Sequence, residues 1–142
     1  MKTIEKEDLM IGNYFMACYT HVEDPLRVAQ KIMSDNFLNV LNDPEIIEKR
    51  GNEVIKSRLH SFQAIPLEEI WLIAFGFEHK RKNGIKYYEE NQIAVVETRS
   101  RGFMVYLNNE LIGTCESVHE LQQIYFSVRK AKLTIQNETS LN

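Results

Sequence analysis

The chain has 142 residues, of which 44% are hydrophobic and 26% charged, and its formal net charge is −3. These values are typical of one globular domain and argue against a bulk basic surface for duplex nucleic acid. No run of residues approaches the ~20 apolar positions of a membrane-spanning helix, and the charged N-terminus lacks the apolar segment of a secretory signal. We therefore expect a cytoplasmic protein with a single domain over residues 1–133 and a polar tail over residues 134–142.

The N-terminal region predicts a buried strand and reduced thiols. An aromatic-rich run follows Gly12-Asn13 and reaches Tyr19, which is typical of a buried strand. Cys18 lies in this run, far in the sequence from Cys115. Because no secretory signal is present, we expect both cysteines to be buried thiols rather than one long-range disulfide.

Residues 24–41 fit two patterns, and local sequence does not decide between them. As a helix, the segment would be capped by Asp24 and carry Pro25 in its first turn. As a hairpin, it would consist of strands over 27–33 and 37–41 around a Ser-Asp-Asn turn.

The centre of the chain predicts one clear helix. Residues 45–59 are polar and charged, and we expect a short helix or an excursion there, followed by a connection. Residues 67–75 carry apolar side chains at helical spacing, with Pro66 and Glu69 at the N-terminal end and Gly76 as a C-cap. This pattern indicates a helix over residues 67–75.

An antiparallel meander is expected next. Asn83-Gly84 between two alternating segments is a strong signal for a tight hairpin. Residues 92–98 alternate in polarity, and residues 103–107 and 110–115 flank an Asn-Asn turn. Hairpin connections of this length join antiparallel neighbours.

The last predicted element is a helix. Ser117 is a candidate N-cap, and Glu120 three residues later would complete a capping box. The whole order predicts an α+β fold, in which a small N-terminal β unit leads to a short helix, an antiparallel β-meander and a C-terminal helix packed on the sheet. The apolar positions of that last helix follow helical spacing: Val118, Leu121, Ile124, Tyr125 and Val128.

Three sequence segments carry a resemblance to a known group of proteins. They are Leu-Met-Ile-Gly-Asn at residues 9–13, Ile-Pro-Leu-Glu-Glu-Ile-Trp-Leu with a later Phe-Gly-Phe at residues 65–77, and Val-His-Glu-Leu-Gln-Gln-Ile-Tyr-Phe at residues 118–126. In this order they resemble a family of small uncharacterised proteins of Bacteroidetes genomes, mobile elements and phages. Glu68 and Gln123 depart from that pattern, in which Thr and Asn are usual. The resemblance implies no activity, but it implies short strands over residues 27–41, a phage or mobile-element origin and a cytoplasmic setting.

The sequence contains no recognisable catalytic or metal-binding constellation. None of the histidines pairs with a second His or a Cys at zinc-site spacing, and no nucleophile motif or phosphate loop is present. His119 and Trp71 lie on predicted helices, and we expect both to have structural roles. We therefore expect no metal, no cofactor and no enzymatic activity, while an enzyme with an unrecognised site is a third hypothesis.

Two basic turns and one helix face are the candidate sites. The turns could bind an anion, with a tyrosine to stack on it, or could simply be solvated lysines that protect an edge strand. An aromatic beside amides on the last helix could belong to an interaction surface. The candidate anion ligands are Lys80, Arg81, Lys82, Tyr87, Arg99 and Arg101, and the candidate surface is Gln122, Gln123 and Phe126.

We therefore predict a non-enzymatic protein-interaction module from a phage or mobile element. Its partner would be a host or element protein, and a homodimer is also open. The alternative is a binder of a small anionic ligand, a nucleotide or single-stranded nucleic acid, which in a phage could sequester a messenger of host defence. Grouping of the basic residues in one concave pocket would favour the alternative, and their dispersal would favour the interaction module.

Overall fold

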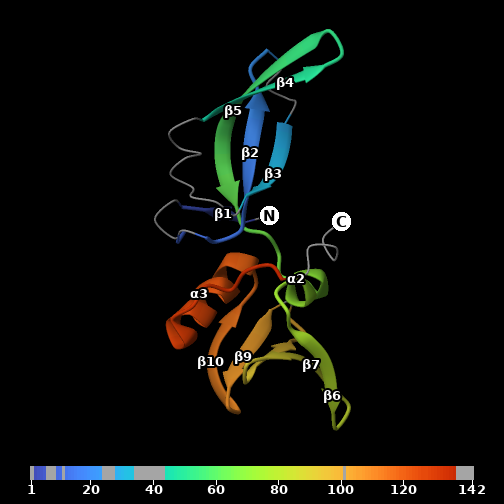
Figure 1. Ribbon diagram of the computed structural model, residues 1–142, viewed down its shortest axis with the longest axis vertical. Coiled ribbons are helices and arrows are strands. Elements are labelled where there is room, and N and C mark those ends of the chain that lie inside the picture. Colours follow the sequence, from blue (N-terminus) through green and yellow to red (C-terminus); the bar gives the residue numbers. More distant parts are fainter. Residues whose placement is uncertain are drawn as a thin grey trace. The chain divides into compact units, whose positions relative to one another are not determined.

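The structure, a computed structural model, describes residues 2–5, 9–10, 12–23, 28–33, 44–100 and 102–136. They form two antiparallel sheets and two helices, so the predicted α+β class is confirmed (Figure 1). The chain divides into two compact units, residues 1–65 and residues 66–142. Each unit contains one of the sheets. The expectation of a single domain over residues 1–133 stays a prediction.

The first unit is built around one long strand. In the strand order β1-β5-β2-β3, the C-terminal half of β5 pairs with β2 and its N-terminal half pairs with β4. A register shift between Cys18 and Tyr19 of β2 marks a bulge in the β2–β5 ladder. The strands are β1 (Thr3–Ile4), β2 (Phe15–His21), β3 (Val28–Met33), β4 (Glu45–Arg50) and β5 (Glu53–Gln63).

The structure shows the conformation of residues 28–33, for which the sequence allowed a helix or a hairpin strand. Residues 28–33 form β3, which pairs along its length with β2, so the helix alternative is wrong there. The second half of the expected hairpin, residues 37–41, lies outside the described residues. Pairing with β2 satisfies the backbone groups of β3 that face β2, which local pattern could not reveal.

The expectation of a short helix or excursion over residues 45–59 is wrong. β4 and β5 form a regular hairpin that turns at Gly51-Asn52, where Gly51 has a φ of 64°. The signal was weak because Ile47 and Val54 are exposed, which spoils the alternation of buried and exposed positions. Here tertiary pairing outweighs a poor local pattern.

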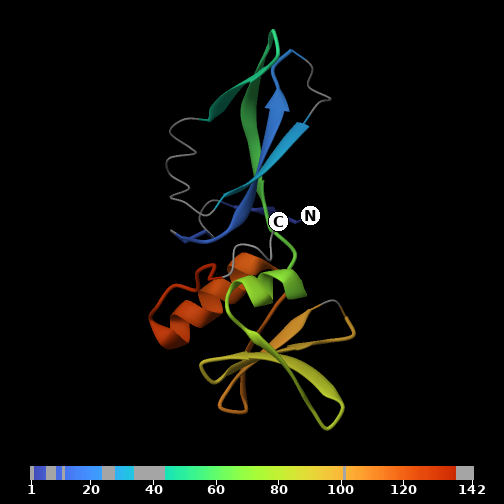
Figure 2. The same ribbon diagram turned by 45° about the vertical axis from the view of Figure 1, so that its right-hand side comes forward.

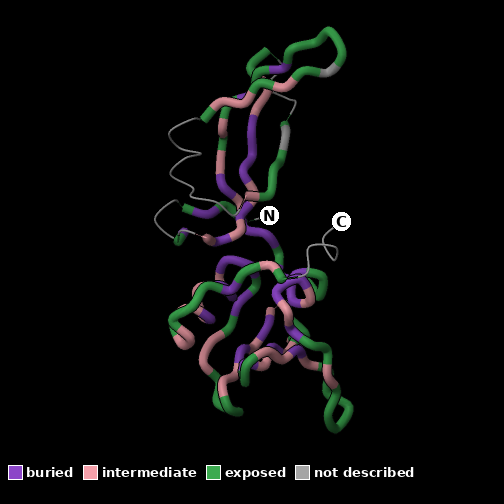
Figure 3. Tube along the Cα trace, in the orientation of Figure 1, coloured by how far each residue is buried: buried purple, intermediate pink, exposed green. Residues whose placement is uncertain are grey.

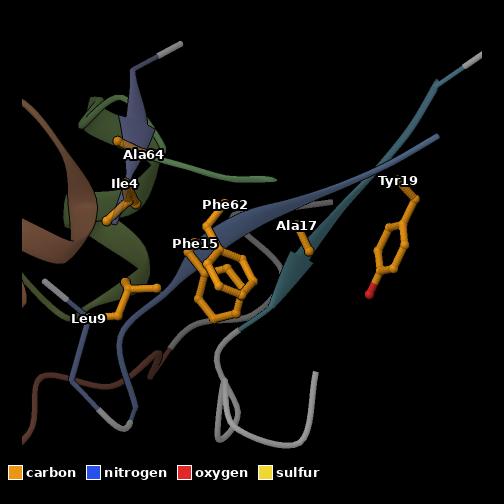
Figure 4. Close-up of a cluster of buried hydrophobic side chains, with 7 residues drawn as sticks. All are labelled: Ile4, Leu9, Phe15, Ala17, Tyr19, Phe62 and Ala64. Carbon is orange, nitrogen blue, oxygen red and sulfur yellow. The ribbon is translucent and has the colours of Figure 1, made fainter. Parts of the chain in front are cut away.

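The core of the first unit lies on one face of its sheet. The rings of Phe15 and Phe62 meet edge to face with centroids 5.1 Å apart, as Figure 4 shows. Phe15 and Ala17 occupy one side of β2, so the predicted buried strand after Gly12-Asn13 is confirmed. The buried cluster consists of Ile4, Leu9, Phe15, Ala17, Tyr19, Phe62 and Ala64.

The second unit contains the helices and the meander, as predicted. Its strands follow in the order β10-β9-β8-β7-β6, each antiparallel to its neighbour. Figure 2 shows both helices on the same side of this sheet. The elements are α2 (Glu69–Ala74), β6 (Glu78–Lys82), β7 (Ile85–Glu90), β8 (Ile93–Glu97), β9 (Phe103–Leu107), β10 (Glu110–Cys115) and α3 (Val118–Arg129).

The N-terminus of α3 differs in detail from the predicted capping box. Ser117 is the N-cap, but its hydroxyl makes no hydrogen bond to a helical N–H. Instead it donates to Oε1 of Glu120 at 2.6 Å, and its oxygen lies 3.1 Å from Nδ1 of His119. The same Glu120 oxygen accepts from the N–H of Glu116 at 3.3 Å. Glu120, in the first turn of α3, therefore holds Ser117 and the residue before it, and the serine hydroxyl is bonded to this carboxylate instead of to a helical N–H.

Other expectations about side chains are confirmed. Cys18 and Cys115 are buried and free, and they form no disulfide. Trp71 is buried and packs 5.9 Å from Phe75, and His119 is buried beside Ser117. Neither α2 nor α3, the helices of the described part, has the length and apolar character needed to cross a membrane.

Candidate binding site

The basic hairpin is formed by β6 and β7. Asn83 and Gly84 both have positive φ, at 52° and 78°, as a two-residue turn of this kind requires. Directly opposite residues in an antiparallel pair share a face, so the register places Lys80 with Tyr87 and Arg81 with Lys86. The basic residues are therefore divided between the two faces of the hairpin.

The tip of the hairpin is exposed to solvent. Lys80 donates to Oε1 of Glu89 at 2.9 Å, and this bond raises the pKa of the lysine. Arg81 and Lys82 are exposed at the tip, which Figure 3 shows as exposed chain. Dispersal of this kind favours the interaction module over an anion site at the tip.

A cavity of about 320 Å³ opens between β7 and β8. The ladder between these strands runs from Glu90–Ile93 only as far as Tyr88–Val95. Beyond that pair the strands separate, and Figure 2 shows the tip of the β6–β7 hairpin well apart from the loop after β8. We call this space the β7–β8 cavity, and it is lined by Ile85, Lys86, Tyr88, Val96, Glu97, Thr98 and Arg99.

Lys86 is held on one wall of the β7–β8 cavity. Its Nζ lies 5.7 Å from the centre of the Tyr88 ring and 3.9 Å from Oε1 of Glu69. Hydrogen bonding to Tyr88 is the main cause that raises the pKa of Lys86. Burial in turn raises the pKa of the Tyr88 phenol, which stays neutral. Lys86 is thus a fixed cation at physiological pH.

Arg99 lies on the opposite side, in the loop after β8. The hydroxyl of Thr98 donates to the carbonyl of Gly102 at 2.9 Å and accepts from the N–H of Gly102 at 3.2 Å. These bonds close the loop and fix the backbone next to Arg99. None of the ion pairs among the described residues includes Arg99. Its guanidinium is therefore free to bind a ligand within this part of the chain.

The predicted anion site is only partly brought together. Of its members, Arg99 lines the β7–β8 cavity, while Lys80 and Tyr87 lie on the other face of the hairpin from Lys86. Arg101 lies outside the described residues. A shared anion site for the whole predicted set stays a prediction. Sequence analysis missed Lys86 as a candidate, although the hairpin signal alone could have placed it opposite Arg81.

The outer face of the second sheet is apolar and carries no helix. Strand alternation sends Tyr88, Val95 and Val105 to the helix side, where all three are buried. The other face, which we call the open face, carries half-buried and exposed apolar side chains. The register joins them across three strands, in the rows Ala94–Tyr106–Leu111 and Val96–Met104. Ile85 and Tyr87 lie on the same side of β7, beyond the end of its ladder with β8.

One of the three residues predicted to form an interaction surface on α3 is buried. Gln122 is only 4% exposed and donates from Nε2 to the carbonyl of Leu133 at 3.0 Å, so its amide anchors the chain after α3 and is not part of an exposed surface. Gln123 and Phe126 are half-buried, and their part in an interaction stays a prediction. Helical periodicity alone could not show that the chain after α3 covers the face that carries Gln122.

A second polar cluster lies at the C-terminal end of α3. A guanidinium nitrogen of Arg129 donates to the carbonyl of Asn91, in the turn between β7 and β8. Burial, and then hydrogen bonding to Glu90, raises the pKa of Tyr125. Within the described chain, Oε2 of Glu90 and Nε of Arg129 are buried without a hydrogen-bond partner. The cluster attaches α3 to the sheet.

Comparison with known proteins adds no further constraint. The chain matches no protein-family model, no curated protein and no solved structure. The resemblance to small proteins of Bacteroidetes genomes, mobile elements and phages therefore stays a prediction. No group of three or more His, Cys, Asp or Glu side chains in the described ranges could hold a metal ion.

Proposed function

We propose that this protein is a non-enzymatic interaction module that binds a partner protein through the open face. The observation that supports this is a set of apolar side chains joined across β8, β9 and β10, on the face of the sheet opposite the helices of the second unit (Figure 2). Single exposed apolar residues are normal on proteins, but a connected patch across several strands is typical of an interaction surface.

The composition of the open face fits a protein partner. Ile85 and Leu111 are 57% and 55% exposed, and two tyrosines lie between them. Tyrosine and methionine are enriched in the cores of interfaces, and Tyr106 contacts Met104 here with 3.7 Å from Oη to Sδ. The Lys80–Glu89 ion pair lies at the β6 edge and would form a polar rim. A partner that covers this surface removes its apolar side chains from water, which favours binding.

The proposal includes the cellular compartment and the origin of the protein. Two free, buried cysteines support a reducing compartment, which in this case is the cytoplasm. The resemblance stated above supports a phage or mobile-element origin, with a host or element protein as the partner. A second copy of the chain is an outcome that the experiment below distinguishes.

The test is site-specific photo-crosslinking in living cells. A photoreactive phenylalanine analogue replaces Tyr106 on the open face or, as a matched control, Lys132, an exposed residue after α3. We expect a defined adduct with another protein from position 106 and none from position 132, with loss of the adduct in a Met104→Lys background. An adduct of twice the chain mass would identify self-association as the interaction. Equal labelling from both positions, or none from position 106, would overturn the proposal.

A further inference from the structure

We propose that the β7–β8 cavity binds a small monocarboxylate, with its carboxylate between Arg99 and Lys86 and its apolar body against Ile85 and Val96. The cavity shares Ile85 and Val96 with the open face, but binding of a small ligand there needs no partner protein and does not depend on the interaction proposed above. The inference rests on an interrupted strand ladder, on the charges of the cavity walls and on the size of the cavity.

The end of the β7–β8 ladder leaves backbone polar groups beside the cavity without a strand partner, where a ligand with polar atoms could bind. A continued register would bring Tyr87 opposite Val96 and then Lys86 opposite Glu97, but the structure pairs neither. Their backbone N–H and C=O groups therefore lack the strand partner that a continued ladder would supply. Lys86 and Glu97 are exposed, so water can bond to these groups, and a ligand with polar atoms can replace that water without loss of hydrogen bonds.

The charges of the walls select the ligand class. Lys86 and Arg99 contribute two positive charges and Glu97 one negative charge, which leaves a small positive balance. Glu69, at 3.9 Å from Lys86, cancels this balance, and Arg99 is then the wall cation that no ion pair among the described residues includes. A doubly charged phosphate would therefore meet uncompensated repulsion, whereas a single carboxylate matches the planar fork of Arg99.

The size and the apolar residues of the cavity limit the rest of the ligand. A volume of about 320 Å³ is at the lower end of the range for small-molecule sites, so the ligand has few carbon atoms. Ile85 and Val96 belong to the open-face side of their strands, and Tyr88 to the buried side. An aliphatic or aromatic body could lie between these side chains while the carboxylate reaches the cations.

Amide chemical shifts can test the proposal directly. Isotope-labelled protein is titrated with hexanoate, with the neutral hexanamide and with inorganic phosphate. We expect saturable shifts at Lys86, Glu97 and Arg99 with hexanoate, and much weaker effects with the other two probes. Arg99→Gln should weaken hexanoate binding about tenfold, because a charge-assisted bond is lost.

Arg81→Gln is the matched control. Arg81 is an exposed cation of the same hairpin that does not line the cavity, so this variant should bind hexanoate like the wild type. Equal weakening in both variants would mean non-specific attraction and would overturn the proposal. Equal binding of hexanamide, tighter binding of phosphate, or the absence of shifts at these three residues would overturn it as well.

Discussion

Cys115 illustrates how its place on the sheet changes the chemistry of one side chain. It ends β10 on the buried side of the second sheet and is only 2% exposed. Burial, with a further contribution from the charge of Glu120, raises the pKa of its thiol to about 12. Because the thiolate is the reactive form, this cysteine is inert in the folded protein.

The raised pKa of Cys115 predicts a loss of stability in alkali. The unfolded thiol releases its proton from about pH 9, whereas the folded one keeps it to about pH 12. The contribution of the buried, protonated thiol to the free energy of unfolding is thus complete below pH 9. Above pH 9, the free energy of unfolding falls by up to ~1.4 kcal/mol per pH unit. Urea unfolding of wild type and Cys115→Ala at pH 7 to 10.5 measures this.

The difference between the two proteins should be constant below pH 8 and shrink steadily above pH 9. A difference that stays constant over the whole range would show that the thiol titrates alike in the folded and unfolded chains. The variant also loses packing in the core, but that loss does not depend on pH.

At the scale of elements, two hairpins show that a turn is predictable from its own residues, whereas the flanking strands depend on pairing. In the β6–β7 hairpin, Asn83-Gly84 predicted the turn and the register that places Lys86. In the β4–β5 hairpin, Gly51-Asn52 makes a similar turn, but the flanking strands read as polar. Turn chemistry is local, whereas the strand character of β4 and β5 depends on pairing with each other and with β2.

Gly84 supplies a prediction about the β6–β7 hairpin. It has a φ of 78°, and an added Cβ would meet no atom within 4 Å, so Gly84→Ala introduces backbone strain without a clash. We expect the variant to lower the free energy of unfolding by ~1 kcal/mol. Gly102→Ala is the control, since Gly102 does not have a positive φ and its Cβ would meet the Cys115 carbonyl at an ordinary 3.6 Å. Thermal unfolding that shows equal losses would contradict the strain argument.

At the scale of the whole molecule, the division into two units is the main finding. The aromatic core around Phe15 and Phe62 lies within residues 1–65. The second unit has its own buried side chains, among which Val95 and Val105 of the sheet and Leu121 of α3 are fully buried. Each unit thus has a core of its own, which is the basic requirement for independent folding.

Phe62→Ala distinguishes one folding unit from two. The substitution should cost ~3–5 kcal/mol in the first unit, because it removes a buried aromatic ring. We expect hydrogen exchange to accelerate in β2 and β5 while β8 and β9 keep their protection. Val105→Ala should produce the opposite pattern. Parallel acceleration in both units, in either variant, would instead support the single domain predicted from chain length.

The candidate sites were predictable to different degrees. The basic hairpin and the presence of Arg99 near a second turn were evident from the sequence. The β7–β8 cavity was not, because it arises where the strands stop pairing after Tyr88–Val95. Similarly, Gln122 fits an exposed stripe by spacing but is covered by the chain that returns to Leu133. Both differences depend on contacts between residues that no local pattern connects.

The sequence by itself determined the elements whose signals are local. Apolar spacing and end residues predicted α2 and α3, and tight turns predicted the meander from β6 to β10. Only the tertiary structure decided that residues 28–33 and 45–63 are strands, that the sheet presents an open face, and that Lys86 and Arg99 line one cavity. Helical periodicity and turn conformation are properties of neighbouring residues, whereas strand pairing and burial depend on segments far apart in the chain.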